Sequence, residues 1–125
     1  MHDTNVPVQN CSKDLAAVRD AIYVIGGKWR LQIIVAMRAG HHRFSDIQKT
    51  VTGISAKVLS NELKELELNG ILKRNVHDST PAIDYSLTGY SDTLIDVITS
   101  LSDWGVQHKQ KIKDDIKNSK TTNTI

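Results

Sequence analysis

Residues 54–74 hold the polar side chains of this sequence that are best suited to pairing with nucleic-acid bases. Asn61 can pair bidentately with adenine, and Lys57 and Lys64 can reach the O6 and N7 atoms of guanine. At about 100° per residue these side chains fall on one side of a helix. The leucines fall on the other side: Leu59, Leu63 and Leu66. The segment therefore predicts a helix that reads DNA, although an ordinary surface helix also opposes Leu to Lys.

Other polar side chains are better suited to the DNA backbone, because hydroxyls and long cations reach phosphate oxygens at the groove edges. In and before the predicted helix these are Ser55, Ser60 and Arg43. Beyond the helix, further side chains could reach flanking phosphates or the minor groove: Lys73, Arg74 and His77. For each of them, a solvated surface position is the alternative interpretation.

The predicted recognition helix has defined ends and is followed by two strands. Ser55 is a natural N-cap, and Gly70 stands where a left-handed C′ residue ends a helix. Residues 71–76 and 83–87 predict strands, with apolar and polar residues alternating in the second, and polar residues 77–81 predict the turn between them. A helix followed by a basic β-hairpin is the layout of a winged helix.

Three shorter predictions complete the fold before this helix. Apolar residues at spacings of three and four predict a first helix from the cap Ser12 to the glycines at 26–27, and a buried second helix over 28–39. Ser45 and Gln48 have the spacing of a capping box, which predicts a short third helix starting after Phe44 and ending near Val51. With a glycine-containing turn, the third helix and the recognition helix form a helix-turn-helix unit. The expected fold class is mainly α with a small β-hairpin, a winged helix-turn-helix.

A last helix is predicted from about residue 89 to 116, with Thr88 as its cap. At 1.5 Å per residue it would be about 40 Å long, whereas a compact domain of this size is about 30 Å across. Its apolar strip either belongs to a frayed end or packs against a second copy, and we favour a homodimer. The residues expected in that interface are Leu15, Val18, Ile22, Leu94, Ile98, Leu101 and Trp104. Two-fold symmetry would place two recognition helices about 34 Å apart, one turn of DNA.

Length and composition favour one soluble globular domain. The 125 residues support a single core, which we place at residues 11–117, between a flexible arm at 1–10 and a flexible tail at 118–125. No stretch approaches the roughly 20 apolar residues of a membrane span, and the first residues lack the apolar region of an export signal. We therefore expect a cytoplasmic protein with no membrane partner.

The charge is distributed unevenly along the chain. The formal net charge is only +2, which is too low for a protein that coats nucleic acid by charge alone. Residues 26–80, however, hold nine Lys and Arg against five Asp and Glu, a net charge of +4. The central segment is therefore modestly basic, as a DNA-binding module would be.

Catalytic and metal-binding patterns are missing from the sequence. The single Cys11 excludes a disulfide within the chain and a multi-cysteine zinc site within it. The histidines show no metal-ligand spacing, and the sequence contains neither a Gly-rich phosphate loop nor a nucleophile elbow. We expect no enzyme activity, no cofactor and no metal.

Several motifs, in this order, resemble those of the HxlR-type winged-helix transcriptional regulators of bacteria, relatives of the MarR group. They are residues 25–29 (IGGKW), 43–47 (RFSDI), 54–60 (ISAKVLS), 63–66 (LKEL), Pro81 and residues 85–88 (YSLT). The resemblance covers about residues 11 to 105. It implies a homodimer that binds double-stranded operator DNA with pseudo-two-fold symmetry and regulates nearby transcription.

Cys11 has two open interpretations. Many members of that family carry a Cys-Pro pair shortly before the Gly-Gly-Lys-Trp motif, and in some the cysteine senses oxidants or electrophiles. Here Cys11 precedes Ser12 and stands 15 positions before Gly26. The start of a helix and nearby Lys13 would favour the thiolate. Cys11 is therefore either an oxidant sensor, which would form an intersubunit or mixed disulfide, or a spectator thiol.

Two functions from other classes stay open. A winged helix can serve as a protein-interaction module, which would bind a partner without salt-dependent affinity for DNA. It can also serve as a small-molecule or metal-responsive sensor, with a pocket between the first and last helices near Trp104. Thermal stabilisation by a metal or a small molecule would favour the sensor.

Overall fold

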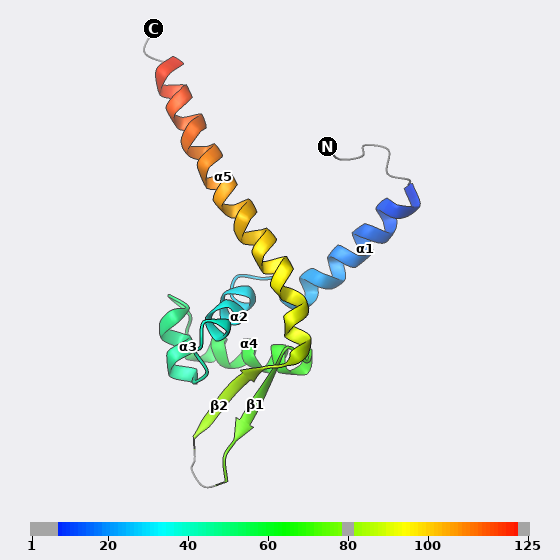
Figure 1. Ribbon diagram of the computed structural model, residues 1–125, viewed down its shortest axis with the longest axis vertical. Coiled ribbons are helices and arrows are strands. Elements are labelled where there is room, and N and C mark those ends of the chain that lie inside the picture. Colours follow the sequence, from blue (N-terminus) through cyan, green and yellow to red (C-terminus); the bar gives the residue numbers. More distant parts are fainter. Residues whose placement is uncertain (1–7, 79–81, 123–125) are drawn as a thin grey trace. The chain divides into compact units, whose positions relative to one another are not determined.

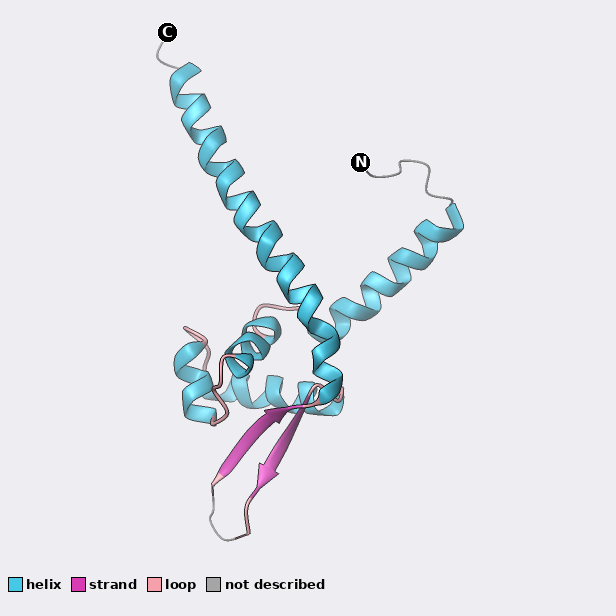
Figure 2. Cartoon of the chain, viewed as in Figure 1, coloured by secondary structure: helices cyan, strands magenta, loops and turns pink. Residues whose placement is uncertain are grey.

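The computed structural model describes residues 8–78 and 82–122. The chain divides into two compact units, residues 1–90 and 91–125. The elements of the first unit are α1 (Val8–Ile25), α2 (Arg30–Arg38), α3 (Phe44–Thr50), α4 (Ala56–Leu68), β1 (Leu72–Val76) and β2 (Ile83–Leu87) (Figures 1 and 2). A 3-10 helix, η1 (Gly89–Leu94), spans the division, and α5 (Ile95–Thr122) forms the second unit.

The core of the first unit lies among three helices and the start of the hairpin. Its fully buried side chains are Ile33, Ile34 and Met37 of α2, Ile47 of α3 and Val51 after it, Leu59, Leu63 and Leu66 of α4, and Ile71 and Leu72. Burying each such side chain contributes about 1.5–3 kcal/mol relative to leaving it exposed. The predicted apolar side of the recognition helix is therefore confirmed, and it fixes which side of α4 faces outward.

Both predicted ends of α4 are confirmed. The Ser55 hydroxyl accepts a hydrogen bond from the backbone N–H of Val58 at 3.2 Å. At the other end Gly70 has a φ of +76°, and the N–H groups of Gly70 and Ile71 donate to the carbonyls of Glu67 and Leu66. This is a Schellman motif, which needs a residue that tolerates the left-handed conformation.

The hairpin is antiparallel, with Leu72 opposite Leu87 and Arg74 opposite Tyr85. Its predicted strands are confirmed, although residues 79–81 of the predicted turn lie outside the described residues. The loop before α3 extends this small sheet, because Arg43 forms a bridge with Asp84 and the Tyr85 N–H donates to the His42 carbonyl at 2.8 Å. The hairpin is thus attached to the segment that leads into the helix-turn-helix.

Two predicted helix starts in the first unit are wrong. The N-cap of α3 is Arg43, in extended conformation and without a side-chain cap bond, so Ser45 is inside the helix rather than at its cap. The pairing of Arg43 with Asp84 fixes this start, and a local capping pattern cannot include that contact. Helix α1 starts at Val8 rather than near Ser12, because neither Gly nor Pro interrupts the sequence from Val8 to Ile25.

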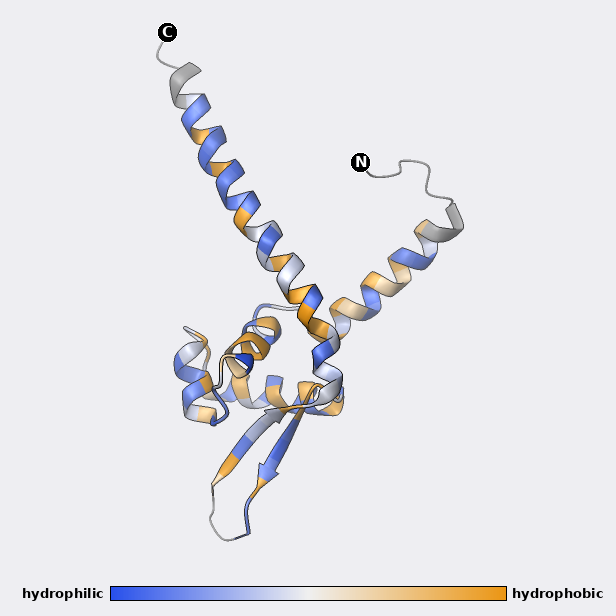
Figure 3. Cartoon of the chain, viewed as in Figure 1, coloured by the Kyte–Doolittle hydropathy of each residue, from blue (hydrophilic) through white to orange (hydrophobic). Residues whose placement is uncertain are grey.

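The second unit is a single long helix preceded by a tighter turn. Thr88 stands just before η1, and its hydroxyl donates to the carbonyls of Gly70 and Ile71 at 2.6 and 3.1 Å. The α-helix proper starts at Ile95 rather than near residue 89, because residues 89–94 form the 3-10 helix, and it ends at Thr122 rather than near residue 116. It has 28 residues, or about 42 Å of length. Hydrophobic residues recur along α5 among hydrophilic ones (Figure 3).

The described helices pass beyond the predicted domain limits. Residues 8–10 of the predicted arm belong to α1, and residues 118–122 of the predicted tail belong to α5. Residues 1–7 and 123–125 lie outside the described residues, so the flexibility of both ends stays a prediction. In the described part of the chain, every helix is too short or too polar to cross a lipid bilayer.

Candidate nucleic-acid interface

The outward side of α4 presents the three side chains predicted to contact bases. Lys57, Asn61 and Lys64 are exposed, on the helix whose leucines form the core. Within the described residues, the side chains of these three have no hydrogen-bond or ion-pair partner. Their donors, and the acceptor of Asn61, are therefore available to groups on another molecule.

Leu68 is a candidate contact that the sequence analysis missed. It is 79% exposed, although it belongs to a helix with a well-packed apolar side. Lys57, Asn61 and Leu68 fall within about 40° of one another around α4. Its position seven residues after Asn61, about two helical turns, could have indicated that Leu68 lies on the same side of the helix as Asn61. An apolar side chain in this place is chemically suited to the methyl group of thymine.

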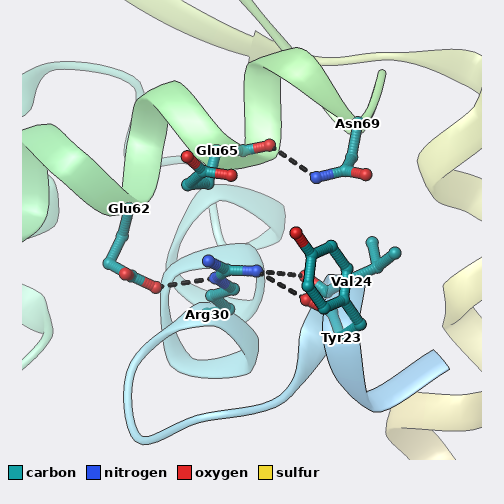
Figure 4. Close-up of polar contacts among 6 residues, drawn as sticks. All are labelled: Tyr23, Val24, Arg30, Glu62, Glu65 and Asn69. Carbon is teal, nitrogen blue, oxygen red and sulfur yellow. Dashed lines mark hydrogen bonds and ion pairs between the residues drawn. The ribbon is translucent and has the colours of Figure 1, made fainter. Parts of the chain in front are cut away.

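Arg30 of α2 holds the recognition helix in place. Its Nε donates to Glu62 Oε2 of α4 at 2.8 Å, and a terminal nitrogen donates to the carbonyls of Tyr23 and Val24 at 2.9 and 3.0 Å (Figure 4). The side chains of Arg30 and Glu62 are only 17% and 22% exposed. One guanidinium therefore joins the carbonyl end of α1 to the flank of α4 that lies beside its buried leucines.

Arg30 and Glu62 are positioning residues that no motif of the sequence indicated. They stand 32 positions apart, so no local spacing relates them. The signal that existed was weaker: an arginine directly follows a Gly-Gly-Lys-Trp segment at the start of a helix. Asn69 adds a local contact, since its side-chain amide donates to the Glu65 carbonyl at 2.9 Å (Figure 4).

The hairpin carries exposed cations and a polar cluster. Lys73 and Arg74 are exposed on β1. His77 is hydrogen-bonded through Nε2 to Asp84 Oδ2 at 2.9 Å, and the Asn75 amide donates to Asp84 Oδ1 at 2.8 Å. The bonds from His77 and then from Asn75 lower the pKa of the Asp84 carboxyl below its ordinary value. His77, predicted to contact the backbone, is thus oriented by Asp84.

A groove of about 440 Å³ lies between α4, the hairpin and the start of α3. Its lining residues are Phe44, Ser60, Leu63, Lys64, Glu67, Arg74 and Tyr85. The structure thus brings together three predicted contacts, Ser60, Lys64 and Arg74. The other predicted contacts lie outside this lining: Arg43, Ser55, Lys57, Asn61, Lys73 and His77. Tyr85 and Glu67 were missed.

The side chains predicted for a homodimer interface are mostly exposed in the single chain. In α1 these are Leu15, Val18 and Ile22, and in α5 they are Leu101 and Trp104, while Leu94 and Ile98 are half-buried. Trp104 stacks on His108, with ring centroids 4.9 Å apart. Cys11 is exposed and is the fourth residue of α1. Among residues 8–78 and 82–122, no three His, Cys, Asp or Glu side chains are grouped as a metal site.

Comparison with known proteins places this architecture in a family. Residues 24–113 match the HxlR-like helix-turn-helix family. YdeP of Bacillus subtilis (strain 168), an uncharacterized HTH-type transcriptional regulator, is 34% identical over 96 residues, which cover 76% of this chain and 75% of YdeP.

Solved structures agree with that match. The redox regulator HypR in its reduced form is similar with a TM-score of 0.71 and 31% identity, over 78% of this chain and 98% of the HypR chain. The reduced form of the transcriptional regulator YodB from B. subtilis is similar with a TM-score of 0.65 and 35% identity, over 73% and 90% of the two chains. YdeP and YodB are named transcriptional regulators, and with the family match this makes the chain a transcriptional regulator rather than an enzyme. With its winged helix and its match over residues 24–113, the chain belongs to the HxlR-like helix-turn-helix family.

Proposed function

We propose that this protein binds a specific double-stranded DNA operator as a homodimer and thereby regulates transcription of nearby genes in the cytoplasm. The observation that carries the proposal is the outward side of α4. Its capped helix is fixed to α2 by Arg30 and Glu62, and it presents Lys57 and Asn61 without internal partners among the described residues. A rigid helix with available donors and acceptors is what direct readout in the major groove requires.

The proposed contacts separate into two kinds. Asn61 and Lys57 read base edges, while Ser55, Arg43 and Lys73 position the protein on phosphates. Loss of a base contact costs roughly 1–3 kcal/mol and relaxes the preference at one base pair, whereas loss of a phosphate contact weakens binding to all sequences alike. The distinction makes the assignment testable at single residues.

The homodimer is supported by the exposed apolar side chains of the two terminal helices, each considered by itself. Leu15, Val18 and Ile22 recur on one stripe of α1, and Leu101 and Trp104 on one stripe of α5. Apolar stripes of this kind mark surfaces that pack against another chain. In a two-fold dimer two copies of α4 would then meet successive turns of one face of the DNA.

The test measures binding of the purified protein to the DNA upstream of its own gene and to a random duplex, across a salt series. We expect preference for the upstream fragment and a steep fall of affinity with salt. Asn61→Ala should lower only the preference, and Lys73→Ala should weaken binding to both duplexes equally. Weak and equal binding of the wild-type protein to both duplexes would instead favour the protein-interaction module.

We further propose that an oxidant controls this binding through Cys11. The thiol is exposed within the first turn of α1, and the structurally similar HypR is described as a redox regulator. An azo oxidant such as diamide would join two Cys11 thiols into an intersubunit disulfide, and its N=N bond would take up the two protons and two electrons that the thiols lose. DNA binding by the wild-type protein should then change with diamide, and Cys11→Ser should abolish the change. An equal response of both proteins would exclude Cys11 as the sensor.

A further inference from the structure

We propose that the groove between α4 and the hairpin holds one phosphate of the DNA backbone, which Lys64 and Arg74 neutralise together. This inference rests on the proposed function, because it needs α4 and the hairpin to bind the same duplex. It reassigns Lys64, which the sequence analysis placed among the base readers, to the backbone. It also adds Tyr85 and Glu67 to the DNA-binding surface.

The chemistry of the groove fits a single phosphodiester. Lys64 approaches from α4 and Arg74 from β1, and Ser60 and Tyr85 supply hydroxyl donors. With Glu67 as the only acidic residue of the lining, the groove has a formal charge of +1, opposite to the single charge of a phosphodiester. Within the described residues, the side chains of Lys64 and Arg74 have no ion-pair partner, so both charges are available.

The two sides of the groove face one another because of simple periodicities. Ser60, Lys64 and Glu67 fall within about 60° around α4, on the flank next to buried Leu63. Arg74 and Tyr85 are direct partners across the antiparallel strands and therefore share one face of the hairpin. Lys73 lies on the opposite face of β1, since successive side chains of a strand alternate.

A DNA strand is the occupant that this position favours. In the proposed complex α4 enters the major groove and the hairpin reaches the flanking minor groove. The sugar-phosphate strand that separates these two grooves then has to pass between α4 and the hairpin. The groove occupies that place, whereas base edges lie farther out, in front of Lys57 and Asn61.

The salt dependence of binding tests whether the two cations share a phosphate. The slope of log affinity against log salt changes by about 0.9 for each phosphate neutralised. Because each protomer of the proposed dimer contributes one groove, we expect the double variant Lys64→Ala/Arg74→Ala to reduce the slope by about 0.9 per protomer, or about 1.8 per dimer, on both the upstream and the random duplex, with neither single variant exceeding that. Contacts to separate phosphates would instead reduce it by about 3.6 per dimer. The matched control is the double variant Lys64→Ala/Lys73→Ala. Its change in slope should equal the sum of the changes in the two single variants, because Lys73 lies outside the groove.

Two further variants test the remaining lining residues. Tyr85→Phe removes only the hydroxyl and should lower affinity for both duplexes by about 10-fold for each protomer bound, as expected for a hydrogen bond to a charged group. Glu67→Gln should raise affinity for both duplexes, because a carboxylate beside the phosphate is repulsive. Thermal melts would confirm that each variant folds.

Three outcomes would overturn the inference in distinguishable ways. A changed base preference in Lys64→Ala would return that residue to base reading. If the change in slope of Lys64→Ala/Arg74→Ala equals the sum of the two single changes, the cations contact separate phosphates. If the wild-type protein lacks salt-dependent DNA binding, the proposed function fails first, and the inference fails with it.

Discussion

Arg30 offers the sharpest test of how the recognition helix is held. Arg30→Met keeps most of the apolar stem but removes three hydrogen bonds, of 2.8, 2.9 and 3.0 Å. The variant leaves the half-buried Glu62 carboxylate and two carbonyls at the end of α1 without this donor. A hydrogen bond to a charged group is worth about 1.5–3 kcal/mol, and bonds to carbonyls less. After discounting for partial exposure, we expect a loss of about 2–3 kcal/mol.

The assay is thermal unfolding at one fixed protein concentration, because a dimer's midpoint depends on concentration. For a domain of this size the expected loss lowers the midpoint by roughly 6–15 °C. The matched control is Lys111→Met, which removes the 2.6 Å bond to Asp115 within α5. That pair is 68% and 56% exposed, so solvent screens it and its loss should leave the midpoint nearly unchanged.

Glu62→Gln completes a double-mutant cycle with Arg30→Met, and the coupling between the two should be at least about 0.5 kcal/mol. The folded Arg30→Met protein should also bind the upstream DNA more weakly, because α4 loses its attachment to α1. The reasoning is refuted if Arg30→Met and Lys111→Met lower the midpoint equally. Burial of the Arg30 contacts would then add nothing to their contribution to stability, compared with the exposed pair of Lys111 and Asp115.

Two other predictions concern the end of α4 and the hairpin. Gly70→Ala should destabilise the protein by about 1 kcal/mol in the same melts, because a φ of +76° is strained for any residue with a Cβ. An unchanged thermal midpoint would contradict the Schellman motif at this helix end. The pKa of the Asp84 carboxyl should lie below 3.8, so its contribution to stability is present above that pH and is lost as the pH falls through the lowered pKa. His77→Ala should raise that pKa in an NMR titration. An unchanged pKa would show that His77 does not cause the lowering.

Local rules explain the parts of the fold that the sequence predicted well. Ser55 caps α4 and Gly70 ends it because these roles depend on the conformation of a few adjacent residues. The buried leucines of α4 and the alternation in residues 83–87 follow from helix and strand periodicity. The capping-box rule failed at Ser45, because the distant bridge between Arg43 and Asp84 sets the start of α3.

By itself, therefore, the sequence determined the winged helix-turn-helix, the helix that faces outward and the family to which the motifs belong. Only the tertiary structure decided how that helix is supported and what lies beside it. Arg30 meets Glu62 across 32 positions, and Lys64 shares a groove with Arg74 and Tyr85 from separate elements. Periodicity assigns a side chain to one face of its own element, whereas a contact between elements depends on how those elements pack.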